Sequence, residues 1–205
     1  MRAYLRACVV LLLLTAFAAC GGKRVLVPPR LDLMPYGRVA LVIFTVENAK
    51  GSLHEFATQR FAEEVLAAQS IEVLELGEMT WLLDESGRTR YGPEEARFIG
   101  EDHGVPLVFV GHMVVSNVKP TASITGIPRV GAEVDLSIAV RLLSTESGAT
   151  VWSRSAEGTA MVGELAFDGG IPSFGGRDPK DAYGDLVDPL IYEITRDLRP
   201  TYRRE

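Results

Sequence analysis

The chain has 205 residues, 47% of them hydrophobic, and its 27 acidic against 21 basic side chains give a formal net charge of −6 at pH 7. This length and apolar content suit one folded domain that buries its own core without disulfide or metal support. The acidic balance disfavours contact with a phosphate backbone, so nucleic acid is excluded as an expected partner.

The N-terminus has the composition of a signal peptide. Arg2 and Arg6 precede a charge-free apolar run from Ala7 to Ala19, which is 13 residues long and ends at Cys20. A membrane-spanning helix needs about 20 apolar residues, so this run is too short to cross a bilayer. Residues 1–19 are therefore predicted to be a signal peptide that is removed on export.

The residues before the expected cleavage point, Phe17 to Cys20, resemble the lipobox of bacterial lipoproteins, with Phe17 where leucine is usual. Cys8 lies in the leader, so the exported part keeps Cys20 alone and forms no internal disulfide. The resemblance implies that Cys20 carries a diacylglyceryl group and an N-acyl chain, which together anchor stably, whereas one chain binds marginally. In the lipoproteins that this segment resembles, a residue such as Gly21 after the cysteine favours the outer membrane, which would place the protein facing the periplasm. The alternative is an ordinary secretory signal that leaves Cys20 as a free thiol.

The exported part divides into a tether and a domain. Removal of 19 of the 205 residues leaves 186, and the loss of Arg2 and Arg6 leaves 19 basic against 27 acidic side chains, a charge of about −8. Residues 20–37 contain three prolines and little periodicity, which predicts a lipidated tether. Residues 38–205 are predicted to form a single domain.

The domain begins with a strand and a helix. The β-branched run Arg38–Val46 predicts a buried strand. Ser52 and Glu55 have the spacing of a capping box, which predicts the start of a helix. Ile71–Leu76 predicts a second strand. The apolar residues at helical spacing, expected to pack on the sheet, are Leu53, Ala57, Phe61, Val65 and Ala68.

The middle of the chain predicts a short helix and a long hairpin. Pro93 opens the helix and Gly104 ends it with a left-handed cap, and Pro106–Val118 predicts a third strand. Alternation over Val134–Leu142 predicts an antiparallel strand, which turns near residue 147. That turn places two apolar pairs on one face: Leu142 with Trp152, and Ile138 with Ala156.

The C-terminal part predicts a loop followed by a helix. Glycine-rich residues Glu164–Arg177 favour a loop, and Asp178 with Pro179 favour a helix start, although Pro189 is expected to kink or interrupt that helix. The fold class predicted is α+β, with a mixed sheet in the order β-α-β-α-β-β-β and a C-terminal helix.

Three segments together resemble one family. They are Val39–Phe44 with Asn48 soon after, Ile99–Gly111, and Val134–Trp152. In this order they resemble the TolB amino-terminal-domain-like envelope lipoproteins, a group that includes the curli-secretion lipoprotein and the lipoprotein activators of penicillin-binding proteins. The resemblance implies an envelope protein partner of unknown identity. It also leaves open a second function, a subunit of an oligomeric outer-membrane secretion pore.

An enzyme is not predicted. The chain's histidines, His54, His103 and His112, form no metal-binding pair in the sequence, so no metal, cofactor or catalytic residue is expected. His54 is expected to be an exposed residue of a helix first turn, His103 a helix C-terminal residue, and His112 a strand-end residue bonded locally. A hydrolase without a recognisable motif is the third function considered.

These observations predict a non-enzymatic protein-interaction module, anchored in the outer membrane and acting in envelope assembly or regulation. The candidate binding surfaces are the loops at Lys119–Arg129 and Glu164–Arg177, because loops on a rigid sheet vary at little cost to the core. The oligomeric state and the envelope process stay open.

Overall fold

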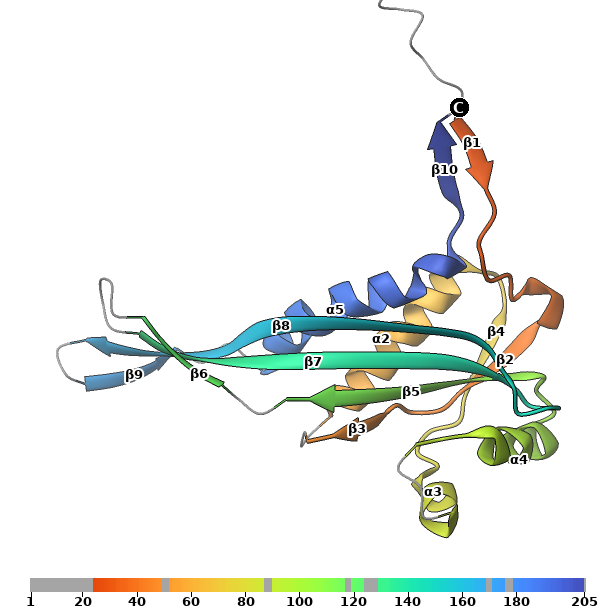
Figure 1. Cartoon of the computed structure of the whole chain (residues 1–205), viewed down its shortest axis with the longest axis horizontal. Coiled ribbons are helices and arrows are strands. Elements are labelled where there is room, and N and C mark those ends of the chain that lie inside the picture. Colours follow the sequence, from red (N-terminus) through yellow and green to blue (C-terminus); the bar gives the residue numbers. More distant parts are fainter. Residues whose placement is uncertain are drawn as a thin grey trace, which may run out of the picture. The chain divides into compact units, whose positions relative to one another are not determined.

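The computed structural model describes residues 24–48, 52–86, 90–116, 119–123, 129–168, 171–175 and 179–204, which fall into two units (Figure 1). The smaller unit holds a two-stranded antiparallel ladder of β1 (Arg24–Val27) and β10 (Thr201–Arg204). The larger unit spans Leu31–Arg199. No helix among the described residues is both long and apolar enough to cross a membrane.

The larger unit is built on a mixed sheet in the order β4-β2-β5-β7-β8-β9. β2 is parallel to both its neighbours, and the later pairs are antiparallel. β3 also pairs with β5, and β6 with β7. The bounds are β2 (Arg38–Leu41), β3 (Thr45–Glu47), β4 (Glu72–Glu75), β5 (Leu107–Val115), β6 (Lys119–Ser123), β7 (Arg129–Ser144), β8 (Thr150–Asp168) and β9 (Ile171–Gly175).

Helices lie on both faces of this sheet (Figure 1). One face packs against α2 (Leu53–Ala68) and α5 (Pro179–Ile194), which continues into η2 (Thr195–Leu198). The other face packs against α3 (Thr80–Ser86) and α4 (Pro93–His103). The mixed α+β class with a helix near the C-terminus is therefore confirmed, with β1, α3, β6, β9 and β10 added to the predicted helices and strands.

The core on the α2 and α5 face is centred on aromatic rings. The Phe61 ring of α2 lies 5.5 Å from Phe44 and 5.0 Å from Phe109 of β5, measured between ring centroids. Phe109 also meets Trp152 of β8 edge-on at 6.1 Å. All three phenylalanines are at most 1% exposed. This aromatic cluster joins α2 to the middle of the sheet.

The structure confirms the predicted packing face of α2 and the predicted C-terminal cap of α4, but not the predicted N-terminal capping box of α2. The predicted stripe of α2 faces the core, with Ala68 partly buried at its end. Ser52 precedes α2 but makes no side-chain cap bond, so the predicted capping box is wrong. In α4 the Gly92 amide donates to Glu95 at 2.7 Å, which satisfies a free first-turn amide. Gly104 ends α4 in the predicted left-handed conformation, with φ 65°.

The predicted hairpin register is confirmed. Leu142 lies opposite Trp152 and Ile138 opposite Ala156, and Gly148 in the turn has φ 72°. The hairpin is longer than predicted, because β8 runs on to Asp168 and pairs with β9. The prediction of a loop over Glu164–Arg177 is therefore wrong for residues 164–168 and 171–175. A ladder pairs backbone N–H and C=O groups, which do not depend on side-chain polarity, so it continues where the apolar alternation has ended.

Three further boundaries differ from the prediction. The strand expected over Arg38–Val46 is divided into β2 and β3, and both halves pair with β5. Most of the loop expected at Lys119–Arg129 belongs to strands, since β6 pairs with the start of β7; residues 124–128 lie outside the described part. α5 continues through Pro189, so the predicted interruption is wrong. Burial of the neighbouring Leu190 and Ile191 offsets the bond that proline cannot make.

The segment predicted as a tether contributes to the fold where it is described. It contains β1, and Leu33 is fully buried in the core. The Leu33 amide donates to Gln69 at 2.6 Å, and the Gln69 amide group donates in turn to the Leu31 carbonyl at 2.5 Å. Residues just before β2 are thus held against the end of α2. Cys20 and the predicted leader lie outside the described residues.

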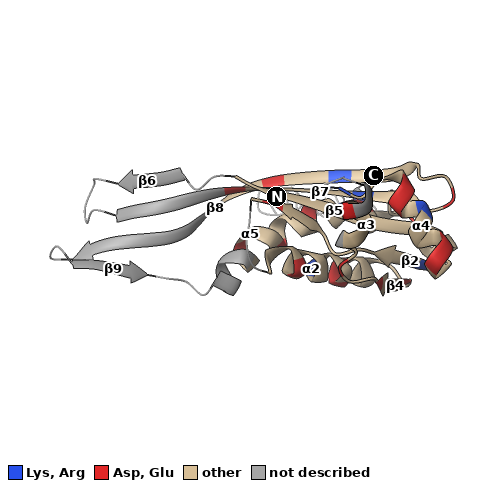
Figure 2. Cartoon of the chain, turned by 90° about the horizontal axis from the view of Figure 1, so that it is seen from below, with Lys and Arg blue, Asp and Glu red and all other residues tan. Residues whose placement is uncertain are grey.

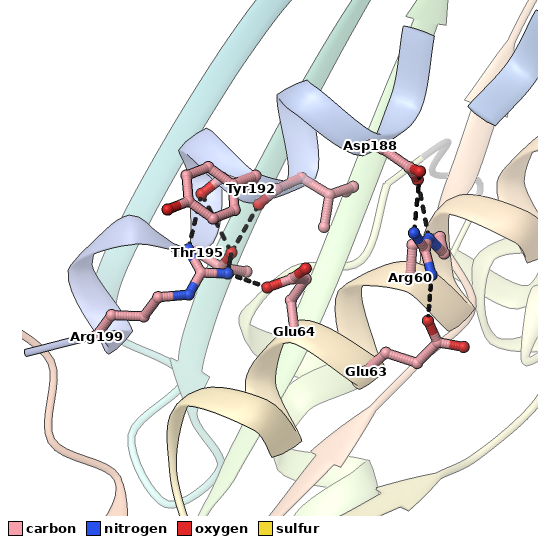
Figure 3. Close-up of polar contacts among 8 residues, drawn as sticks. Arg60, Glu63, Glu64, Asp188, Tyr192, Thr195 and Arg199 are labelled. Carbon is pink, nitrogen blue, oxygen red and sulfur yellow. Dashed lines mark hydrogen bonds and ion pairs between the residues drawn. The ribbon is translucent and has the colours of Figure 1, made fainter. Parts of the chain in front are cut away.

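Ion pairs join α2 to α5 and to Arg199, the residue after η2 (Figure 3). Arg60 donates to both carboxylate oxygens of Asp188, at 2.8 and 2.9 Å, and to Glu63 at 2.6 Å. Arg199 donates to Glu64 and lies over the Tyr192 ring, 4.2 Å from its centroid. Because these contacts join parts of one molecule and hold the helices together, their role is to stabilise the fold.

Candidate functional site

Part of the sheet face opposite α2 and α5 is left open by the described helices. α3 and α4 cover β2 and the start of β5, where Val108 and Val110 are buried. Further along, His112 of β5 pairs with Ala139 of β7, which pairs with Ser155 of β8. Ala139 and Ser155 are exposed. Because alternate residues share a face, this row forms a surface that we call the open sheet face. Its other described members are Val114, Asp135, Ser137, Arg141, Ser153, Glu157 and Thr159.

His112 is the buried polar residue of this face. Its side chain is 10% exposed, and its Nδ1 lies 2.8 Å from the Thr45 hydroxyl of β3. Its Nε2 lies 3.2 Å from a Glu47 carboxylate oxygen, within ion-pair distance, but the angle does not make a hydrogen bond. The prediction of a strand-end residue bonded locally is wrong, since His112 lies inside β5 and its partner is 67 positions away.

The contacts of His112 favour one placement of its proton. The Thr45 hydroxyl is closer to Nδ1, at 2.8 Å, than to the Gly111 carbonyl, at 3.3 Å, so it is best placed to donate to Nδ1. The carboxylate of Glu47 lies on the Nε2 side. Both contacts favour a neutral imidazole with its proton on Nε2. That proton is a buried donor without a well-directed acceptor.

Two arginines complete the site. A cavity of about 260 Å³ is lined by Arg90, Tyr91, Val110, Gly111, His112, Ala139 and Arg141. The Arg141 guanidinium donates to the Tyr91 carbonyl at 2.5 Å, which holds it beside the segment after α3. Arg90 lies 3.6 Å from Glu47. With a neutral histidine, two guanidinium groups and one carboxylate leave the site with a net positive charge.

The electrostatics keep His112 neutral. Burial lowers the pKa of His112 below its ordinary value of 6.5, and Arg90 and Arg141 lower it further, whereas Glu47 acts in the opposite direction. Burial also raises the pKa of Tyr91 to about 12, so its phenol stays protonated at neutral pH. The cavity therefore has fixed positive charges beside uncharged donors.

This pKa shift predicts a pH dependence of stability. The pKa of His112 is lower in the fold than in the unfolded chain, so between the two values the unfolded chain binds more protons. The contribution of His112 to the free energy of unfolding is therefore fully present above pH 6.5, and it falls as the pH decreases towards the pKa of His112 in the folded protein. We expect His112→Gln to lose less stability than the natural chain between pH 7 and pH 5.5, measured by urea unfolding. His103→Gln is the control, and an equal pH dependence in all three proteins would contradict the assignment.

Two further cavities lie near this site. One of about 380 Å³ lies on the open sheet face and is lined by residues that include Ser116, Asp135, Ser137, Glu157 and Thr159. The Thr159 hydroxyl donates to Asp135 at 2.7 Å, so this end of the face is acidic and polar.

The other cavity, of about 260 Å³, contains the residues with metal-ligand spacing. His54, Glu55 and Glu78 bring ligand atoms within 4.8 Å of one another, and His54 and Glu78 line the cavity. His54 lies in the first turn of α2 as predicted, but its side chain is 18% exposed, so the prediction of an exposed residue is wrong. Both carboxylates are exposed and well solvated, which favours an ion pair over a closed metal site.

His103, the remaining histidine, lines none of these three cavities. His103 is the last residue of α4, as predicted, and lies 3.2 Å from Asp102. The sequence did not identify Arg90 and Arg141 as site residues. Arg141 lies within the predicted strand Val134–Leu142, but nothing local to Arg90 indicated that it would share a cavity with β5. Acidic residues gather elsewhere, along α2 and α4 (Figure 2).

No protein-family model matches the chain, and no curated protein does. Its fold is similar to the PelC dodecamer from Paraburkholderia phytofirmans, at 16% identity over 87% of this chain and 97% of that chain, with a TM-score of 0.46. It is also similar to the lipoprotein GNA1162 from Neisseria meningitidis, at 14% identity over 78% and 98%, with a TM-score of 0.42. A minor lipoprotein from Acinetobacter baumannii is 10% identical over 83% and 98%, with a TM-score of 0.35. Two of these three proteins are named as lipoproteins.

Proposed function

We propose that this protein is an envelope lipoprotein, held by acyl groups on Cys20 in the outer membrane, whose folded part faces the periplasm and binds another envelope protein without catalysis. The observation that carries the proposal is the sequence Phe17 to Cys20 at the end of a charge-free run of 13 residues. Gly21 supports the outer membrane by resemblance. The exported part is acidic, which suits it to protein partners better than to nucleic acid.

The open sheet face supports an interaction role. It carries exposed Ala139, Ser153 and Ser155, with a basic cavity towards one end and an acidic cavity towards the other. A surface with charges of opposite sign at its two ends favours one orientation of a bound chain. Binding there requires no movement of the core.

Separation of envelope membranes on a sucrose density gradient tests the proposal. We expect the protein in the outer-membrane fractions and protected from protease until the outer membrane is opened. Crosslinking in whole cells is expected to join it to a discrete partner. A soluble periplasmic protein, or one confined to inner-membrane fractions, would contradict the proposed location.

A hydrolase is the second candidate, because Thr45, His112 and Glu47 bring together a hydroxyl, an imidazole and a carboxylate. A working triad requires the carboxylate to orient the imidazole through a hydrogen bond. Here Nε2 makes none, so the imidazole is not oriented in that way. Hydrolysis of an activated ester that disappears in Thr45→Val would favour this candidate over the non-enzymatic proposal.

The pore subunit makes a different prediction. β7 has 16 residues and β8 has 19, both longer than the 9–11 residues that a membrane-crossing strand needs. A pore requires a ring of subunits that survives extraction in mild detergent. Light scattering of the extracted protein distinguishes the two hypotheses, because a large uniform ring favours the pore and a monomer favours the interaction module.

A further inference from the structure

The cavity beside His112 contains a buried donor that the fold leaves unsatisfied. Almost all buried polar groups in proteins have a hydrogen-bond partner, so each exception calls for an explanation. His112 is nine-tenths buried and its Nε2 makes no hydrogen bond. A ligand with an acceptor oxygen would satisfy this donor.

The charges around this donor select the kind of acceptor. Arg90 and Arg141 both line the cavity, and the bond from Arg141 to the Tyr91 carbonyl uses one of the five N–H groups of its guanidinium. Glu47 already places a carboxylate 3.2 Å from His112 and 3.6 Å from Arg90. The fold therefore accommodates a carboxylate next to His112 and Arg90, which both line the cavity. Glu47 is 40% exposed at its side chain, so an incoming carboxylate can displace it into solvent.

The size of the cavity selects a side chain as the ligand. Its volume of about 260 Å³ is below the range of about 300–1,000 Å³ that holds a whole drug-sized molecule. Ala139 forms part of its lining and continues into the exposed small residues of the open sheet face. An extended chain lying on that face can place one of its side chains in the cavity. Asp135 and Glu157 at the other end would repel a second acidic group there.

We propose that the open sheet face binds an acidic segment of a partner protein, and that a carboxylate of that segment replaces Glu47 between Arg90, Arg141 and His112. This proposal rests on the interaction function proposed above and names the chemistry of the partner. It places the binding surface on the sheet, whereas the sequence favoured the loops at Lys119–Arg129 and Glu164–Arg177. Histidine with its proton on Nε2 and the two guanidinium groups supply the donors.

The test measures binding of a short acidic probe to the full processed protein in detergent. The probe is a blocked tetrapeptide with two central glutamates, and its counterpart has glutamines in their place. The chain has three histidines, so the ring signals in an NMR spectrum report separately on His112. We expect the glutamate peptide to shift the His112 signal in a saturable way, and the glutamine peptide to leave it unchanged.

Three variants are expected to change binding of the glutamate peptide in different ways. Arg141→Gln removes a guanidinium from the cavity and is expected to weaken binding by about tenfold. Arg97→Gln is the matched control, because Arg97 likewise donates to a backbone carbonyl, that of Ser147 at 2.7 Å, but lies outside the cavity, and we expect no change. Glu47→Gln removes the competing carboxylate and is expected to strengthen binding by roughly threefold.

Several outcomes would overturn the proposal. They are equal shifts with the two peptides, equal loss of binding in Arg141→Gln and Arg97→Gln, or a response to inorganic phosphate but not to the glutamate peptide. If cells yield a crosslinked partner that Arg141→Gln retains in full, the interaction function stands and this site assignment fails. If the peptide binds as expected but cells yield no partner, the carboxylate site stands and the proposed function fails.

Discussion

Replacing Cys20 with serine is expected to abolish acylation and leave the chain at its full length. A serine hydroxyl does not form the thioether that precedes cleavage in the lipoproteins that residues 17–20 resemble. Lost acyl chains also remove the anchor, since each buried CH₂ contributes about 0.8 kcal/mol of membrane binding. The measurement combines labelling of cells with a clickable palmitate analogue and the intact mass of the protein, which shows whether the first 19 residues are removed.

Cys8→Ser is the control for this experiment. Cys8 lies inside the apolar run of the predicted leader, so its replacement is expected to leave both labelling and cleavage unchanged. The two cysteine variants differ only in which thiol is lost. Continued palmitate labelling of Cys20→Ser would show that the lipid assignment is wrong. Cleavage without any labelling of the natural chain would favour the ordinary secretory signal.

Phe61→Ala is expected to lower the free energy of unfolding by about 3–5 kcal/mol. Phe61 is fully buried and contacts the rings of both Phe44 and Phe109, so truncation leaves a cavity between α2 and the sheet. These rings come from three separate segments and cannot close the space without moving the sheet. Urea unfolding followed by tryptophan fluorescence measures the change.

Leu66→Ala on the same helix is the matched control. Leu66 is 49% exposed, and its loss is expected to change the free energy of unfolding by less than about 0.5 kcal/mol. Both substitutions place alanine, the best helix former, in α2, so neither reduces helix propensity. A similar effect of the two variants would mean that Phe61 does not lie at the centre of the core.

Gly111 connects the aromatic cluster to the candidate site. A methyl group at this position would overlap the Phe44 ring, so the close approach of Phe44 to β5 requires glycine. The next residue, His112, faces the opposite side of the sheet and lines the basic cavity. The packing of one face therefore fixes the backbone that presents the histidine on the other.

Local patterns in the sequence were enough for the hairpin and two helices. The pairing of Leu142 with Trp152 follows from strict alternation and a single short turn, and the two paired residues are only ten positions apart. Gly104 ended α4 where a left-handed residue was predicted. In α2 the apolar stripe was sufficient, because helical periodicity depends on residues only three or four positions apart.

The candidate site could not be predicted in the same way. His112 binds Thr45 across 67 positions, and Arg141 meets the Tyr91 carbonyl across 50. Each of these contacts exists only after β3, β5 and β7 pair and the segment after α3 packs against the face of β5 and β7. The ladders of β6 and β9 have the same origin, since they pair through backbone groups that leave no mark in the residue pattern.

The sequence by itself therefore determined the local elements: the stripe of α2, the cap of α4 and the register of the β7–β8 hairpin. Those features depend on neighbouring residues along one chain segment. The signal peptide over residues 1–19 and the acylation of Cys20 stay predictions. The tertiary structure alone decided that Phe44, Phe61 and Phe109 meet, and that Arg90, His112 and Arg141 surround one cavity. The physical reason is that burial and charge pairing depend on which distant segments the fold brings into contact.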